Sequence, residues 1–135
     1  MVYQIESLNW SWRLRAWVDI LGRLMLVSLF LGSAADHVMH GGATADLIGQ
    51  RGLPIAHVLV WGVIAVELGA GLAFVIGWRP HLAALALAAF TIVATTLFHL
   101  HPQDEAEMHL FFKDVAICGA LLCLAVRPWP RAERP

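Results

Sequence analysis

Four long apolar stretches, residues 17–39, 55–77, 80–100 and 104–126, fill most of this chain. A helix needs about 20 mostly apolar residues to cross the hydrocarbon layer of a bilayer, and each stretch meets that length. A helix also satisfies its backbone hydrogen bonds internally, as lipid requires. The chain is therefore predicted to be all-α, an integral membrane four-helix bundle, with residues 1–135 forming a single transmembrane domain.

The composition agrees with lipid as the main solvent. The chain is 59% hydrophobic and 14% charged, whereas soluble domains average about 45–50% apolar residues. The formal net charge of −1 and the lack of basic clusters argue against a nucleic-acid partner. The first apolar stretch carries Asp19 and Arg23 and is not followed by a small-residue cleavage site, so it is expected to remain as a spanning helix.

Arginines concentrate at one set of helix ends, which we call the inner end; these are Arg13, Arg15, Arg79, Arg127, Arg131 and Arg134. The opposite, outer end carries only Arg51 near the membrane and has acidic residues in the loop before the fourth stretch. The positive-inside rule then predicts that both termini are cytoplasmic; in a Gram-negative cell the outer end would face the periplasm. The basic, Pro-rich tail from Arg127 is expected to be poorly ordered.

Local signals predict the connections between the four helices. Trp78-Arg79-Pro80 indicates a tight inner turn with proline in the first turn of the third helix. Residues 44–51 are typical of a short interfacial segment, with Leu47 and Ile48 dipping into the membrane.

Histidines gather at the outer end. Of the seven histidines in the chain, only His81 is placed at the inner end. Asp36 with His40, and Glu105 with His109, are four residues apart, so the members of each pair share a helix face. Imidazole and carboxylate groups are ligands of transition metals. A metal site is one interpretation of this group, and its candidate ligands are His40, His99, His101, Glu105 and His109.

Charged residues also fall deep inside the spans, where each needs a partner or a function. Glu67 lies near the middle of the second helix and is predicted to face the bundle interior, either paired with Arg23 or neutral. Arg23 can also pair with Asp19 along one face of the first helix. Either a structural pair or a proton or ligand role is compatible with this pattern.

Lys113 and Asp114 lie in the outer half of the fourth helix. The long lysine side chain can extend outward towards Asp36 or His99. Such a combination of cation, carboxylate and imidazole could hydrogen-bond a quinone carbonyl, or could satisfy itself without a ligand.

At these residues the chain resembles the DoxX family of small four-helix bacterial membrane proteins. The resemblance covers about residues 23–125 and rests on motifs that occur in order; these are Arg23 to Ala35, Gly52-Leu53-Pro54, Glu67-Leu68-Gly69-Ala70-Gly71, Phe98-His99 and Phe112-Lys113-Asp114. The family is named after a subunit of an archaeal terminal quinol oxidase, and related chains are linked to thiosulfate:quinone oxidoreduction. The resemblance places Glu67, His99 and Lys113 on recurrent polar positions. The chain departs from the family at Asp36-His37, where a lysine is frequent.

The leading hypothesis is a redox-associated inner-membrane subunit that binds quinone near the outer face. Its catalytic candidates are Glu67, His99 and Lys113, and its substrate-binding candidates are Arg23, Asp36, His37 and Asp114. Since the chain has no haem-ligand pattern or dinucleotide motif, the electrons would come from a redox partner subunit or a bound metal. The alternatives are a membrane-embedded metal-dependent enzyme or metal-binding protein, and a structural or assembly subunit without catalysis. The bilayer is the expected partner throughout, and a homo-oligomer is compatible with so much apolar surface.

Overall fold

The computed structural model describes residues 12–99 and 105–129, and these residues form helices without strands. The helices in chain order are α1 (Trp12–Met39), α2 (Gly41–Gln50), α3 (Ala56–Ile76), α4 (Pro80–Phe98) and α5 (Glu105–Val126). The four long helices, α1, α3, α4 and α5, are long and apolar enough to cross a membrane. The all-α, four-span architecture predicted from the sequence is therefore confirmed. The segment expected at the outer interface is the short helix α2.

The inner turn between α3 and α4 follows from its residue types. Gly77 adopts a left-handed backbone with φ of 77°, which glycine reaches without steric cost. The Trp78 N–H then donates to the Ala73 carbonyl over 2.9 Å, which satisfies an orphan carbonyl at the end of α3. Pro80 opens α4, where its missing N–H costs nothing. The chain thus reverses over three residues and α4 returns alongside α3.

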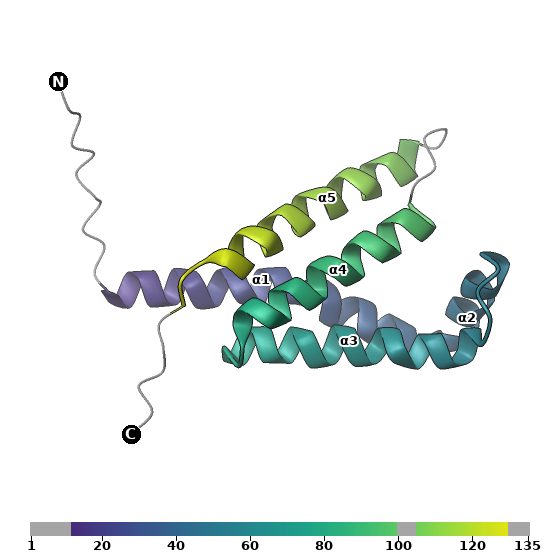
Figure 1. Ribbon diagram of the computed structural model, residues 1–135, viewed down its shortest axis with the longest axis horizontal. Helices are drawn as coiled ribbons and strands as arrows, with labels where there is room; N and C mark the ends of the chain where they lie inside the picture. The colour runs from purple at the N-terminus through teal and green to yellow at the C-terminus, as the bar shows by residue number, and fades with distance from the viewer. Residues whose placement is uncertain (1–11, 100–104, 130–135) are drawn as a thin grey trace.

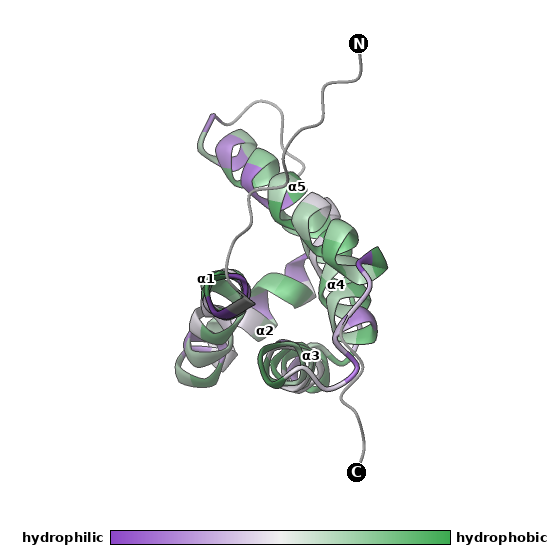
Figure 2. Ribbon diagram, turned by 90° about the vertical axis from the view of Figure 1, so that its left-hand side faces the viewer, coloured by the Kyte–Doolittle hydropathy of each residue, from purple (hydrophilic) through white to green (hydrophobic). Residues whose placement is uncertain are grey.

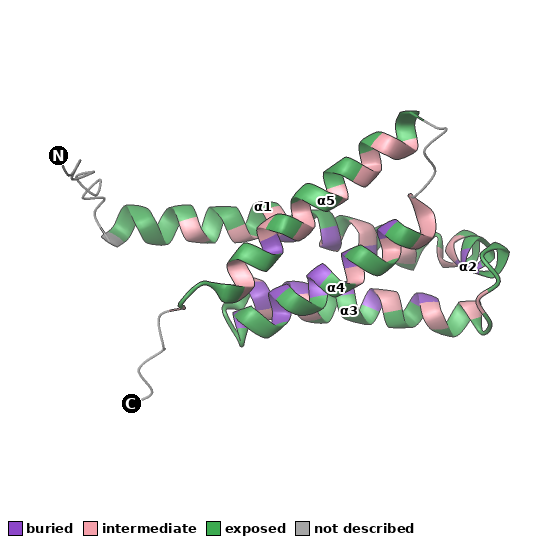
Figure 3. Cartoon of the chain, turned by 45° about the horizontal axis from the view of Figure 1, so that its top comes forward, coloured by how far each residue is buried: buried purple, intermediate pink, exposed green. Residues whose placement is uncertain are grey.

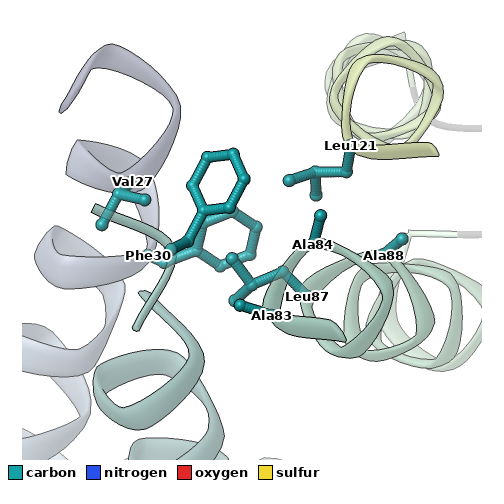
Figure 4. Close-up of a cluster of buried hydrophobic side chains, with 8 residues drawn as sticks. Val27, Phe30, Ala83, Ala84, Leu87, Ala88 and Leu121 are labelled. Carbon is teal, nitrogen blue, oxygen red and sulfur yellow. The ribbon is translucent and has the colours of Figure 1, made fainter. Parts of the chain in front are cut away.

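The long helices form two antiparallel pairs, α1 with α3 and α4 with α5, and the pairs meet where α3 packs on α4 (Figure 1). The main core lies at this junction. Val27 and Phe30 of α1 cluster with Ala84 and Leu87 of α4, and Leu121 of α5 completes the cluster (Figure 4). A second apolar cluster holds α2 against the outer part of α3 through Ala45, Ile48, Val60 and Ile64.

The outward faces of the helices are as apolar as the interior. Large side chains such as Trp17, Met25, Trp61 and Ile76 are each more than two-thirds exposed. Figure 2 shows hydrophobic residues along most of each long helix, and Figure 3 shows burial confined to the sides where helices meet. An apolar surface of this extent is stable only against lipid, so the chain contacts the bilayer along all four spans.

Gly71 sets the close approach of α1 and α3. A Cβ atom at this position would lie 3.3 Å from Cγ1 of Val27 and 3.8 Å from Cδ2 of Leu31. Small residues allow helix backbones to approach closely in lipid, where packing rather than water drives association. Gly69, two residues earlier, has open space around the same position.

We expect Gly71→Leu to force α1 away from α3 and to lower the free energy of unfolding by about 1–3 kcal/mol, as overpacking of cores does. Gly69→Leu makes the same chemical change on the open face and should change stability by no more than about 0.5 kcal/mol. Thermal unfolding of both variants in the same detergent measures the difference. Equal behaviour of the two variants would show that the α1–α3 contact is not tightly packed.

Candidate functional site

Glu67 is the most deeply buried ionisable side chain among the described residues. It projects from the middle of α3 into the bundle and is only 1% exposed. One carboxylate oxygen, Oε2, lies 3.0 Å from Nδ1 of His37, near the end of α1. The imidazole of His37 is itself mostly covered, with 21% of its side chain exposed. Glu67 therefore faces the interior, as predicted, and is hydrogen-bonded across the α1–α3 contact.

Arg23 is not the partner of Glu67, so the proposed pairing of these two residues is wrong. Arg23 lies at the inner end of the bundle, where Nη2 pairs with Asp19 over 2.5 Å and Nη1 donates to the Phe74 carbonyl over 3.4 Å. Its guanidinium lies 4.2 Å from the ring centre of Trp129. The pairing of Asp19 with Arg23 along α1 is the alternative that the structure confirms.

The C-terminal end of the described chain completes this inner cluster. Arg127 donates to the second oxygen of Asp19 over 2.7 Å, and Trp129 packs edge-to-face on Phe74 with ring centres 6.0 Å apart. The indole N–H of Trp129 also caps α5 by donating to the Leu124 carbonyl over 3.1 Å. Poor order was expected from Arg127 onwards. This expectation is wrong for residues 127–129; the tail beyond them lies outside the described residues.

A second set of polar side chains joins α4 to α5 in the outer half of the bundle. The hydroxyl of Thr95 donates to Asp114 over 2.8 Å. His99 lies one turn further out; its Nδ1 is 2.7 Å from Glu107, while its Nε2 is 4.0 Å from Asp114. Lys113 is next to Asp114 on α5, and its Nζ lies 3.7 Å from the other carboxylate oxygen of Asp114. This arrangement forms an acid–imidazole–acid series that runs from the outer end inward.

The two interior carboxylates lie well inside the hydrocarbon layer. At about 1.5 Å per residue, Glu67 is about 14 Å from the inner end of α3 and Asp114 is about 18 Å from the inner end of α5, in a layer about 30 Å thick. An unpartnered charge at such depth costs several kcal/mol. Each carboxylate instead has a hydrogen-bond partner on a neighbouring helix.

The remaining outer residues are more open. His40, which lies between α1 and α2, is hydrogen-bonded to Asp36 of α1 over 2.8 Å, but both side chains are more than half exposed. Glu105 and His109 are exposed on the first turns of α5. Within residues 12–99 and 105–129, no three His, Cys, Asp or Glu side chains lie where they could hold a metal ion. His101 lies outside the described residues, so the complete metal set remains a prediction.

Sequence reasoning missed Thr95 and Trp129 as members of these clusters. Thr91 and Thr95 are one helical turn apart on the buried face of α4, and a polar pair on one face of a spanning helix is a usable signal for an interhelical hydrogen bond. The position of Trp129 had no comparable signal, because a single tryptophan between prolines does not indicate where the chain turns.

Removing the imidazole of His37 should destabilise the protein much more than removing that of His40. His37→Ala leaves the Glu67 carboxylate buried without this partner, which costs about 1–3 kcal/mol. His40→Ala breaks an exposed pair of the same chemistry and should cost less than about 1 kcal/mol. Denaturant unfolding in detergent provides the comparison. Adding Glu67→Gln to His37→Ala should recover part of the loss, and a strictly additive double variant would contradict the coupling.

Comparison with known proteins agrees with this architecture. The family model described as DoxX matches residues 18–100, which include Arg23, His37, Glu67 and His99 but not α5. Inner membrane protein YqjF of Escherichia coli (strain K12) is 27% identical over 107 residues, covering 79% of this chain and 81% of that protein. No solved structure matches the chain. Together with the four spanning helices, these matches show a multi-pass inner-membrane protein that belongs to the DoxX family.

Proposed function

We propose that this chain is the quinone-binding, proton-relaying subunit of an inner-membrane oxidoreductase. The observation that carries the proposal is the pairing of buried Glu67 with His37 inside the membrane span. Ionisable groups at such depth are costly and commonly mark proton or substrate pathways. The quinone class comes from the resemblance to the DoxX family, and the residues supply the chemistry that a quinone needs.

Reduction of a quinone to a quinol takes up electrons and an equal number of protons. Lipid contains no water to supply those protons, so side chains must carry them from the outer end into the span. Glu107 and His99 form one such hydrogen-bonded pair between α4 and α5, and Asp114 lies 4.0 Å from the second imidazole nitrogen. His37 and Glu67 supply a second proton-carrying pair between α1 and α3. The electrons are assigned to a redox partner subunit.

His99 and Lys113 have the donor groups that suit a quinone head. Nδ1 of His99 is occupied by Glu107, but its Nε2 is too far from Asp114, at 4.0 Å, for a hydrogen bond. Lys113 is nearly half exposed, and its ammonium is 3.7 Å from Asp114, beyond ordinary hydrogen-bond length. Lys113 can therefore donate to a carbonyl oxygen at the outer ends of α4 and α5, and Nε2 of His99 can donate to the same oxygen when the imidazole carries both protons. The apolar helix faces would receive the isoprenoid tail.

The first test is quinone retention by the full chain purified in mild detergent. His99→Ala/Lys113→Ala should lower the retained quinone about tenfold, because two hydrogen bonds of about 0.5–1.5 kcal/mol each are lost. His81→Ala, which removes an exposed histidine from the inner end of α4, is the matched control and should retain quinone as the parent protein does. Retention that is equal in all three proteins, or absent in the parent, would overturn the proposal.

The relay is tested separately from binding. Glu67→Gln keeps the shape of the side chain but cannot take up a proton, so it should leave quinone retention unchanged and slow proton uptake when the bound quinone is chemically reduced in liposomes. A pH-indicating dye follows that uptake. If Glu67→Gln changes only thermal stability and leaves the rate of proton uptake unchanged, the His37–Glu67 pair stabilises the packing of α1 on α3 and carries no protons.

A further inference from the structure

A cleft of about 350 Å³ opens between α1 and α5 at the inner end, at the opposite end of the bundle from the proposed quinone site. α1 and α5 belong to different helix pairs and do not pack along their lengths in the described part of the chain. They are joined at this end by the ion pair of Arg127 with Asp19. The cleft is therefore the seam between the two helix pairs, open at its side to the surrounding lipid.

Positive charge dominates the polar wall of the cleft. Arg15, Arg23 and Arg127 line it, and Asp19 is the one carboxylate among its lining residues. Asp19 already receives hydrogen bonds from both Arg23 and Arg127, so one negative charge is shared between two guanidinium groups. The lining thus carries three guanidinium groups against one carboxylate, so the polar wall of the cleft has a net positive charge.

The rest of the wall is apolar and leads towards the bilayer centre. Leu26 and Leu124 lie on the membrane side of the arginines, and Gly22 lies between them and Arg15 on α1. A Cβ atom at Gly22 would meet no heavy atom within 4 Å, so this part of the wall is open. Exposed tryptophans, Trp17 and Trp78, lie at the same end, as expected for side chains at the level of lipid headgroups.

From this order of charged and apolar groups we infer that the cleft binds one anionic phospholipid from the leaflet at the inner end. The phosphate lies against the guanidinium groups of Arg15, Arg23 and Arg127, which suit phosphate oxygens in geometry and charge. One acyl chain runs past Gly22 along Leu26 and Leu124. The lipid fills the seam between the helix pairs and is chemically independent of the quinone proposal.

The test uses the full chain in detergent, titrated with phosphatidylglycerol and observed by native mass spectrometry. We expect one tightly retained phosphatidylglycerol per chain and no comparable retention of phosphatidylcholine. Arg15→Gln/Arg127→Gln should weaken retention about tenfold or more, because each arginine near a membrane surface contributes to anionic-lipid binding. Arg13→Gln/Arg79→Gln removes the same charge from the same end without touching the cleft lining and should leave retention unchanged.

Gly22→Leu separates a lipid from a free anion. The new side chain occupies the open wall without altering any charge, so it should reduce phosphatidylglycerol retention as strongly as the double arginine variant does. Soluble glycerol phosphate, used as a competitor, should displace the lipid poorly because it lacks the acyl chain. The inference is overturned if all variants retain phosphatidylglycerol equally. It is also overturned if Gly22→Leu has no effect while glycerol phosphate competes fully, since that result indicates an anion site alone.

Discussion

The absence of water between the membrane faces governs the whole arrangement of this protein. In lipid, a polar side chain gains nothing by pointing outward, so the two interior carboxylates turn towards a neighbouring helix. Glu67 reaches His37 across α1 and α3, and Asp114 reaches Thr95 across α4 and α5. Small residues such as Gly71 bring the backbones close enough for these contacts. The packing of the helices and the positions of the polar groups therefore have a common cause.

The helices were predictable because their length is imposed by the membrane. Apolar runs of bilayer length, the glycine and proline of the inner turn and the apolar segment of α2 each have a local physical reason. Only the ends differ, since α1 begins at Trp12 rather than at residue 17. The extra turn contains Arg13 and Arg15, which end the apolar run without ending the helix, so composition alone places such ends poorly.

The partners of the polar residues were less predictable. The distance of a residue from the membrane surface can be counted along a helix from the sequence. This count placed Glu67 near the bilayer centre, where a charge facing lipid is costly, and so predicted that Glu67 faces the bundle interior. The identity of its partner depends on how far each helix is rotated and tilted, which the sequence does not encode locally. Arg23 illustrates the problem: its level on α1 suggested Glu67, whereas aromatic contact with Trp129 and the charge of Asp19 hold it at the inner end. A pair four residues apart on one helix, such as Asp19 with Arg23, needs no such information and was predicted correctly.

The pairing of Asp19 with Arg23 within one helix has a consequence for how the protein is made. Helix α1 leaves the ribosome long before Arg127 and Trp129 have been synthesised, so their contacts cannot help it enter the membrane. A carboxylate and a guanidinium one turn apart compensate each other's charge within the helix itself. The first span can thus partition into lipid with its charges already matched. The later arrival of α5 then adds a second arginine to Asp19 and an aromatic cover to Arg23, so that the same pair also joins α1 to the residues that follow α5.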